Sequence, residues 1–360
     1  MHFLEDNRRQ NLKEQYEQRE ILHSRPLHVA VPTGERCNLR CIFCTDRSNR
    51  PYADLTFDQF LEFTEPMEAA GLIQLYGWGE PLVNPNYERI FDYVTNRFFG
   101  ARVYVSTNGV LLTDSWIDKF LSYEKCLINV SLNAATRATY ARIAQLDLFD
   151  RVVDNVDRLL RDRDRRGVTQ LVVSLSFVAV RPNIAELAKF VSLCKDLGVT
   201  YGIIQDLNIM EERHRSLHVG QNEFRARRLF LAAARKARKF GIYLDSFTHY
   251  PATYFSQDRS QTTRIDLPRD CLSVWEQDDE SPFYPQPGEC YEPYKTFMIS
   301  QNGAVTTCCR AREVMGNLRE RSFQEIWNGE IYRAYRRSIN TFRPPAACIF
   351  CPVKQGSDVR

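Results

Sequence analysis

Several features that would assign this chain to a class of protein are missing from its sequence. No run of eighteen apolar residues occurs, so no transmembrane helix is expected. The first residues, Met1–Asp6, carry charge and lack the apolar stretch of a secretory signal. The net charge is only +3 and no long block of one sign occurs, which indicates neither nucleic acid nor a membrane surface as a partner.

Internal repeats and low-complexity segments are also missing, whereas cysteine is plentiful. The 360 residues are 44% hydrophobic and 26% charged, which is typical of one large globular domain with a smaller one. The eleven cysteines come without an export signal. In a reducing compartment clustered cysteines indicate metal or redox chemistry rather than disulfides, so we expect a cytoplasmic metalloprotein.

Three cysteines lie within eight residues, directly after the apolar run 28–31. They are Cys37, Cys41 and Cys44. Three thiolates on one loop can hold three irons of an iron–sulfur cube and leave the fourth iron open to a small molecule. On spacing alone, part of a zinc site or a group of buried thiols are the alternatives.

Strand and helix patterns alternate along residues 26–250. Strands are expected at 28–31, 72–76, 102–106, 126–132, 170–180, 201–205 and 242–244. Helices are expected at 4–22, 57–70, 87–98, 114–123, 136–144, 148–166, 184–197 and 221–240. Repeated βα units imply parallel strands, so we predict an α/β fold, a partial (β/α)6 TIM-like barrel with its chemistry at the carboxyl ends of the strands.

The pattern divides the chain into four parts. We expect an N-terminal helical extension at 1–25, the barrel at 26–250, and a linker or covering loop at 251–288, where Asp, Gln, Ser and Pro are frequent. Residues 289–360 form a small α+β unit, with a hairpin around Asn302-Gly303 and a helix over 322–339.

Most of the expected strands end in residues that a ligand could use. Gly77-Trp78-Gly79-Glu80-Pro81 follows the second strand, and its glycines permit a close backbone approach while Pro81 stiffens the exit. Ser106-Thr107-Asn108-Gly109 ends the third strand, and Ser131-Leu132-Asn133-Ala134, followed by Arg142, ends the fourth. Asp206 and Asn208 end the sixth and could meet a polar ligand, as could His249 and Tyr250.

In this order, the cysteine loop and the strand-end motifs resemble the signature of the radical S-adenosylmethionine (radical SAM) family over residues 28 to about 245. Trp78 stands in place of the first of two paired glycines. The resemblance implies that the three loop cysteines hold a [4Fe–4S] cluster whose open iron chelates SAM. It also implies SAM contacts, with Ser131 and Arg142 at the carboxylate, from Phe43, Gly77, Gly79, Glu80, Pro81, Ser106, Asn108, Ser131, Asn133 and Arg142.

Four further cysteines are spread over the C-terminal part of the chain, at Cys290, Cys308, Cys348 and Cys351. Four thiolates are enough for a second cluster, and the hairpin, helix and terminal Cys-x-x-Cys resemble the SPASM/twitch extension of radical SAM enzymes, with one auxiliary [4Fe–4S] cluster. A zinc ribbon is the alternative. Cys309 is a spare thiol, a hydrogen donor or a ligand, and the role of Cys271 stays open. Cys126 and Cys194 lie in apolar patterns and are expected in the core.

The resemblance implies reductive cleavage of SAM to a 5′-deoxyadenosyl radical, which abstracts hydrogen from a substrate C–H bond. An auxiliary cluster that moves an electron suggests an oxidoreductase reaction, a dehydrogenation or an epimerisation. Only 36 residues precede Cys37, too few for a leader-binding domain, so we expect a small polar metabolite such as a sugar or aminocyclitol derivative.

The alternatives are a peptide maturase and, from other classes, an iron–sulfur electron carrier or a zinc scaffold. The expected partners are a substrate and an electron donor such as flavodoxin or ferredoxin.

Overall fold

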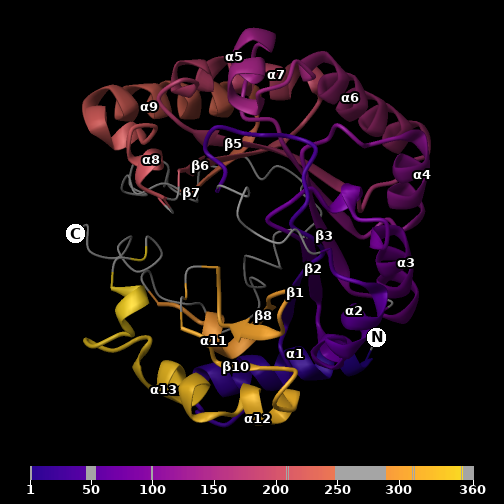
Figure 1. Ribbon diagram of the computed structural model, residues 1–360, viewed down its shortest axis with the longest axis vertical. Coiled ribbons are helices and arrows are strands. Elements are labelled where there is room, and N and C mark those ends of the chain that lie inside the picture. The colour runs from indigo at the N-terminus through magenta and orange to yellow at the C-terminus, as the bar shows by residue number, and fades with distance from the viewer. Residues whose placement is uncertain are drawn as a thin grey trace. The chain divides into compact units, whose positions relative to one another are not determined.

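The computed structural model describes residues 2–45, 54–98, 100–207, 209, 211–247, 289–309, 311, 313–349 and 351. They form two compact units (Figure 1). The first comprises Met1–Arg36, Ala53–Val105 and Asp270–Arg360, and the second Cys37–Tyr52 and Ser106–Arg269. The expected linker at 251–288 lies outside the described residues, as do Asn208, His249, Tyr250 and Cys271.

In the first unit, parallel strands of the barrel are continued by strands from the C-terminal part of the chain. β1 (His28–Pro32) pairs with β2 (Leu72–Tyr76), and β2 pairs with β3 (Arg102–Thr107), whose last two residues belong to the second unit. On its other side β1 pairs in parallel with β8 (Thr296–Ile299). Beyond β8 lie the antiparallel strands β9 (Ala304–Thr306) and β10 (Gly316–Asn317). The edge of β1 is therefore closed by pairing with a strand more than 260 residues away, as the register His28 to Thr296 shows, a pairing that local sequence does not reveal.

The second unit holds four parallel strands in chain order, β4 (Cys126–Ser131), β5 (Val172–Ala179), β6 (Tyr201–Asp206) and β7 (Tyr243–Phe247). Helices run along the outer side of these strands in Figure 1. They are α4 (Asp114–Ser122), α5 (Arg137–Ala144), α6 (Phe149–Arg165), α7 (Leu187–Leu197) and α9 (Glu223–Phe240). β4 and β5 are buried on both faces, as expected of parallel strands covered by helices. The predicted α/β class with a parallel partial barrel is confirmed.

Two expected helices are each divided, one close to Pro66 and the other at Gly329, where the backbone is extended. α2 (Phe57–Glu62) starts at the predicted capping box on Thr56, but a 3-10 turn, η1 (Glu65–Ala69), replaces its second half. Pro66 disfavours helical backbone at the residue before it. The helix expected over 322–339 is divided into α12 (Phe323–Trp327) and α13 (Glu330–Ser338). At Gly329 between them, a Cβ atom would lie 2.6 Å from the Glu325 carbonyl oxygen.

The remaining helical elements are short or follow the expected pattern. They are α3 (Tyr87–Arg97), α8 (Glu212–Arg215), α11 (Glu292–Lys295), η2 (Pro81–Val83), η3 (Ile184–Glu186), η4 (Val219–Asn222) and η6 (Ala346–Cys348).

The N-terminal helix α1 (His2–Tyr16) is anchored to the C-terminal part of the chain by buried polar side chains. The Asn11 side-chain amide donates to Ser24 Oγ at 2.9 Å and to the Tyr294 carbonyl oxygen at 2.7 Å. The Trp327 indole donates to the Ser24 carbonyl oxygen at 2.9 Å. The N-terminal extension is therefore part of the packing of α11 and α12.

Candidate functional site

The backbone that leads into the cysteine loop is bonded to the turn after β2. Gly79 donates its backbone N–H to the Gly34 carbonyl oxygen at 3.2 Å, and Glu80 donates to the Arg36 carbonyl oxygen at 2.8 Å. Arg36 is followed in the chain by Cys37. The Gly-Trp-Gly-Glu-Pro turn thus fixes the residues that enter the cysteine loop.

This backbone contact is what requires the two glycines. A Cβ atom at Gly77 would lie 2.3 Å from the Gly34 carbonyl oxygen, and one at Gly79 would lie 2.1 Å from the Arg36 carbonyl oxygen. No side chain fits at either distance. Trp78 between them is 52% exposed, so an indole there leaves the contact intact.

An ion pair holds the same segment from another side. Arg36 pairs with Asp54, and this hydrogen-bonded carboxylate raises the pKa of the Arg36 guanidinium. Gly34 and Asp54 form a backbone bridge, and a Cβ atom at Gly34 would lie 2.6 Å from Asp54 Oδ1.

The end of the turn is built by its two other predicted site residues. The Glu80 side chain is 3% exposed and accepts a hydrogen bond from the Leu82 backbone N–H at 3.2 Å. Pro81 is buried and begins the short helix η2. Glu80 therefore caps η2 with its carboxylate.

The cysteine loop itself belongs to the second unit and is bonded to α5. Ile42 donates its backbone N–H to the Ile143 carbonyl oxygen at 3.0 Å, and Cys44 donates to the Cys41 carbonyl oxygen at 3.0 Å. The Leu39 backbone N–H points at Cys37 Sγ, 3.4 Å away. A backbone N–H directed at sulfur stabilises the thiolate form that binds iron.

Ile42 and Phe43 pack against a buried apolar cluster made of Ile143, Val180 and Leu207. Phe43, which the family resemblance gave as a cofactor contact, is half-buried in this packing. It anchors the loop between Cys41 and Cys44.

Asn108 connects the motif after β3 to the first loop cysteine. Its side-chain amide donates to Asn38 Oδ1 at 2.7 Å and lies 3.8 Å from Cys37 Sγ. Its Oδ1 accepts from the Val110 backbone N–H at 3.0 Å, which closes the turn. Asn108 is thereby fixed at both ends, with an N–H group directed at the thiol.

The other predicted residues at the strand ends are bonded to neighbouring strands. Ser106 Oγ accepts from the Asn129 side-chain amide at 3.2 Å. Asn133 has a positive φ of 59°, and its amide donates to Ser131 Oγ at 2.8 Å while its Oδ1 accepts from the Val178 backbone N–H at 2.8 Å. Asn133 therefore shapes the end of β4.

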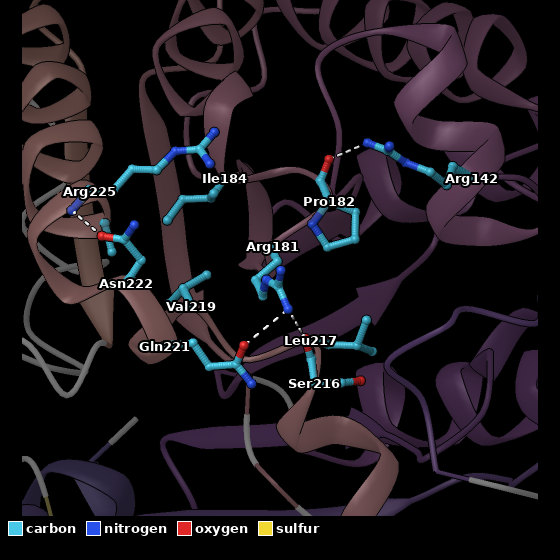
Figure 2. Close-up of a pocket in the computed structure, with 11 residues that line it drawn as sticks. Arg142, Arg181, Pro182, Ile184, Ser216, Leu217, Val219, Gln221, Asn222 and Arg225 are labelled. Carbon is cyan, nitrogen blue, oxygen red and sulfur yellow. Dashed lines mark hydrogen bonds between the residues drawn. The ribbon is translucent and has the colours of Figure 1, made fainter.

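Arg142, which the resemblance pairs with Ser131 at the SAM carboxylate, lies on the exposed side of α5. It bonds to Pro182, whereas Ser131 accepts a hydrogen bond from Asn133. Arg142 donates to the Pro182 carbonyl oxygen and lines a pocket of about 590 Å³ (Figure 2). Asp206 ends β6 and is partly buried.

Two residues of α8 reach the cysteine loop, although nothing in the sequence marked them. Arg213 Nη2 donates to the Cys44 carbonyl oxygen at 2.6 Å, and His214 Nε2 lies 3.3 Å from the same oxygen. His214 is fully buried. The sequence of Glu211–Arg215 is typical of a charged surface turn. Only the tertiary contact shows that Arg213 and His214 support the cysteine loop.

The C-terminal cysteines lie around a shared set of residues in the first unit. Cys290 is close enough to Cys308 for a charge on one to raise the pKa of the other, and burial raises the pKa of the Cys290 thiol to about 12. Charges on Cys308 and Cys348 both act on Tyr335, whose pKa is raised mainly by burial. Cys351 donates its backbone N–H to the Cys348 carbonyl oxygen at 3.2 Å. Cys290 therefore lies near Cys308, Cys308 and Cys348 both lie near Tyr335, and Cys351 follows Cys348 within one turn.

The remaining cysteines separate into core and surface. Cys126 and Cys194 are fully buried and burial raises the pKa of both thiols, which confirms them as core residues. Cys309 is exposed, and the pKa of Tyr76 at the end of β2 is raised by burial and next by a charge on Cys309.

The donor set fits iron–sulfur clusters. In the described part of the chain, no three His, Cys, Asp or Glu side chains converge as ligands of a single metal ion. A cubane instead takes one thiolate at each of several irons, so its ligands are spread over the corners. Three thiols on one loop, with the Leu39 and Asn108 N–H groups directed at Cys37, match the open cube.

Two family models match the chain. Residues 31–194 match the radical SAM superfamily, and residues 290–352 match an iron-sulfur cluster-binding domain, SPASM. Radical SAM domains bind a [4Fe–4S] cluster and SAM, and SPASM domains bind auxiliary iron–sulfur clusters. These cofactors agree with those expected from the cysteines.

The relatives have related but different activities. The AdoMet-dependent heme synthase of Methanosarcina barkeri is 25% identical over 324 residues, 86% of this chain and 85% of the relative. The mycofactocin maturase MftC of Mycobacterium tuberculosis is 29% identical over 169 residues, 46% of this chain and 41% of the relative.

Among solved structures, Streptococcus suis SuiB bound to S-adenosylmethionine superimposes with a TM-score of 0.64 at 14% identity, over 97% of this chain and 75% of that one. Another SuiB structure holds the precursor peptide SuiA. This likeness establishes the fold. No helix among the described residues is long and apolar enough to cross a membrane.

Proposed function

We propose that this chain, which belongs to the radical SAM superfamily and carries a C-terminal SPASM iron–sulfur domain, abstracts hydrogen from a C–H bond of a small organic substrate and oxidises the product radical. The observation that carries the proposal is the N–H group that Asn108 directs at Cys37, the first of three thiols on one loop of the second unit. Within the first unit, Glu80 bonds to Arg36, the residue before that cysteine in the chain.

The loop residues have distinct roles in this proposal. Cys37, Cys41 and Cys44 hold the cluster, which together with bound SAM supplies a reductively formed 5′-deoxyadenosyl radical. Leu39 and Asn108 direct N–H groups at Cys37 and stabilise its thiolate. Ile42 and Phe43 fix the loop on the buried cluster of Ile143, Val180 and Leu207.

The SAM contacts are assigned to residues at the strand ends. Gly77 and Gly79 shape the backbone of the first contact, with Glu80 and Pro81 behind them. Ser106, Asn108, Ser131 and Asn133 supply polar groups at the ends of β3 and β4. Arg142 supplies the cation for the carboxylate once its side chain leaves Pro182, because a guanidinium forms strong charge-assisted bonds with a carboxylate.

We assign residues 289–360 as the auxiliary-cluster domain, with Cys290, Cys308, Cys348 and Cys351 as ligands. Binding of a metal cation to sulfur displaces the thiol proton, so iron would convert Cys290 to the thiolate that coordinates it. A cluster with four protein thiolates has no position for substrate, so its role is to accept or return an electron. This role makes the enzyme an oxidoreductase.

The substrate class that we favour is a small molecule. The heme synthase spans 86% of the chain, whereas the mycofactocin maturase spans less than half. Asn11 of the N-terminal helix bonds to Tyr294, and Ser24, which follows the helix, bonds to Trp327, so the N-terminal extension packs against the C-terminal part of the chain. A sugar or aminocyclitol derivative fits the polar end of β6 at Asp206.

Peptide modification is the second candidate, and the match to a maturase favours it. We place the reaction in the cytoplasm, where thiols and clusters stay reduced, with flavodoxin or ferredoxin as the electron donor.

The test is an anaerobic assay of the reconstituted protein with dithionite and SAM. The wild type should form 5′-deoxyadenosine, and the triple change of Cys37, Cys41 and Cys44 to alanine should abolish it. The variant with Cys348→Ala and Cys351→Ala should still form 5′-deoxyadenosine but lose about four irons. Continued cleavage by the triple variant would refute the proposal.

A further inference from the structure

A pocket of about 590 Å³ opens beside α5 (Figure 2). None of the residues that line it is acidic. Its cations come from three separate elements: Arg142 from α5, Arg181 from the segment after β5, and Arg225 from α9. Guanidinium groups keep their charge at all physiological pH values. The pocket is therefore a concentrated positive region in a chain whose net charge is only +3.

One residue of this pocket, Leu217, belongs to the same apolar packing as the cysteine loop. Leu217 lines the pocket and also packs against the buried cluster of Ile143, Val180 and Leu207. Ile42 of the cysteine loop packs against the same cluster, and its backbone N–H is bonded to the Ile143 carbonyl oxygen. One layer of apolar side chains thus connects the pocket with the loop.

A second connection runs through residues 211–222, which we call the strap. At one end of the strap, Arg213 and His214 hold the Cys44 carbonyl oxygen. At the other, Arg181 Nη1 donates to the Ser216 carbonyl oxygen at 3.1 Å and to Gln221 Oε1 at 3.0 Å, as Figure 2 shows. The strap therefore joins the wall of the pocket to the last cysteine of the loop.

We propose that this pocket is the docking site for an acidic one-electron carrier protein, an inference that rests on the proposed function. The donor loses one electron and the iron–sulfur centre of the cysteine loop gains it, with no change in bonds or protons. A substrate must touch the radical that attacks it, whereas Leu217 of the pocket and Ile42 of the cysteine loop pack against the same buried cluster of Ile143, Val180 and Leu207. An electron needs no such contact, and carboxylates around the donor's cofactor complement Arg181 and Arg225, which stay in the pocket when Arg142 turns to SAM.

The test separates donor docking from catalysis. Arg225→Gln removes one charge of the pocket and leaves unchanged both Arg142, which is assigned to SAM, and Arg181, which holds the strap. The matched control is Arg165→Gln, an arginine of α6 whose side chain is 70% exposed. Reduced flavodoxin and reduced ferredoxin are each used as donors, and dithionite serves as the small reductant.

With the better of the two donors, 5′-deoxyadenosine formation by the pocket variant should fall several-fold at low salt, and its dependence on salt should weaken. Titration calorimetry should show weaker binding of the oxidised donor, while the dithionite-driven rate and the control variant stay at wild-type values. Equal donor-driven rates in pocket and control variants would overturn the inference, as would an equal loss with dithionite. Failure of the wild type with dithionite would instead refute the proposed function.

Discussion

The side-chain amide of Asn108 lies 3.8 Å from Cys37 Sγ and donates to Asn38 Oδ1 at 2.7 Å. A residue 71 positions away in the sequence thus supplies an N–H group to the first cysteine of the loop. Hydrogen bonds to a cluster thiolate raise its reduction potential, because they stabilise the added negative charge.

The first prediction concerns this hydrogen bond. Asn108→Asp retains the acceptor for the Val110 N–H but removes the donor and adds a negative charge. The midpoint potential of the loop cluster should fall by on the order of 50 mV, the equivalent of about 1 kcal/mol. Redox titration followed by electron paramagnetic resonance measures it. Asn183→Asp, whose amide bonds only to backbone carbonyl oxygens, is the control, and an equal potential for both variants would contradict the prediction.

The second prediction concerns the close backbone contact at Gly79. Gly79→Ala places a Cβ atom 2.1 Å from the Arg36 carbonyl oxygen, so the segment entering the cysteine loop must shift. Overpacking of this kind costs about 1–3 kcal/mol, and iron content after reconstitution should fall with it. Gly71→Ala is the control, since its Cβ atom would have its nearest contact at 3.9 Å. Full iron loading of the Gly79 variant would count against this prediction.

The third prediction concerns the anchoring of the N-terminal extension by Arg336. This side chain is 3% exposed, donates to the carbonyl oxygens of Pro293 and Glu20, and lies 4.6 Å from the Trp327 ring centroid. Burial lowers the pKa of its guanidinium to about 10. Arg336→Met leaves two carbonyl groups without their donor and should lower the free energy of unfolding by about 2–4 kcal/mol in urea titrations.

The neighbouring residue provides the comparison for Arg336. Arg337 is exposed and pairs with Glu20 and Glu330 at the surface, so Arg337→Met should cost less than about 1 kcal/mol. Similar losses for the two variants would show that the buried guanidinium contributes no more than a surface ion pair.

The fourth prediction concerns the pH dependence of stability at His28. Burial, and next the charge of Lys295, lower the pKa of this imidazole to about 4, while Glu292 acts in the opposite direction. The unfolded chain takes up the proton below about pH 6.5, whereas the folded chain does so only near pH 4. The contribution of His28 to the free energy of unfolding is therefore fully present above pH 6.5. It falls by roughly 1 kcal/mol per pH unit as the pH is lowered toward about 4. His28→Gln should flatten this slope between about pH 4 and 6.5, as measured by urea unfolding, and an unchanged slope would exclude His28 as its source.

The fifth prediction concerns the two residues that hold the Cys44 carbonyl oxygen. His214→Ala should speed the loss of iron to a chelator several-fold, because the last turn of the loop loses a buried contact. His214→Gln keeps an N–H donor and should restore much of the protection. Arg215→Ala, which removes only a surface pair with Glu212, should match the wild type. Equal rates of iron loss from all three variants would show that His214 does not support the cysteine loop.

The sequence by itself determined the local features of this chain, and it predicts which residues carry the chemistry. The spacing of Cys37, Cys41 and Cys44 is local, and so are the strand and helix patterns, the capping boxes at Thr56 and Ser322, and the burial of Cys126. Such features depend on neighbours a few residues apart, and the parallel strands followed from their repetition.

Only the tertiary structure decided what these residues contact. The pairing of β8 with β1, the contact of Asn108 with Cys37 and that of His214 with Cys44 join distant segments without leaving a local pattern. The glycines after β2 show the difference most clearly. Their sequence indicates a close backbone approach, and the structure shows that the approaching backbone is that of Gly34 and Arg36, at the entrance to the cysteine loop. Packing partners are set by how the whole chain closes, and no stretch of sequence contains that information alone.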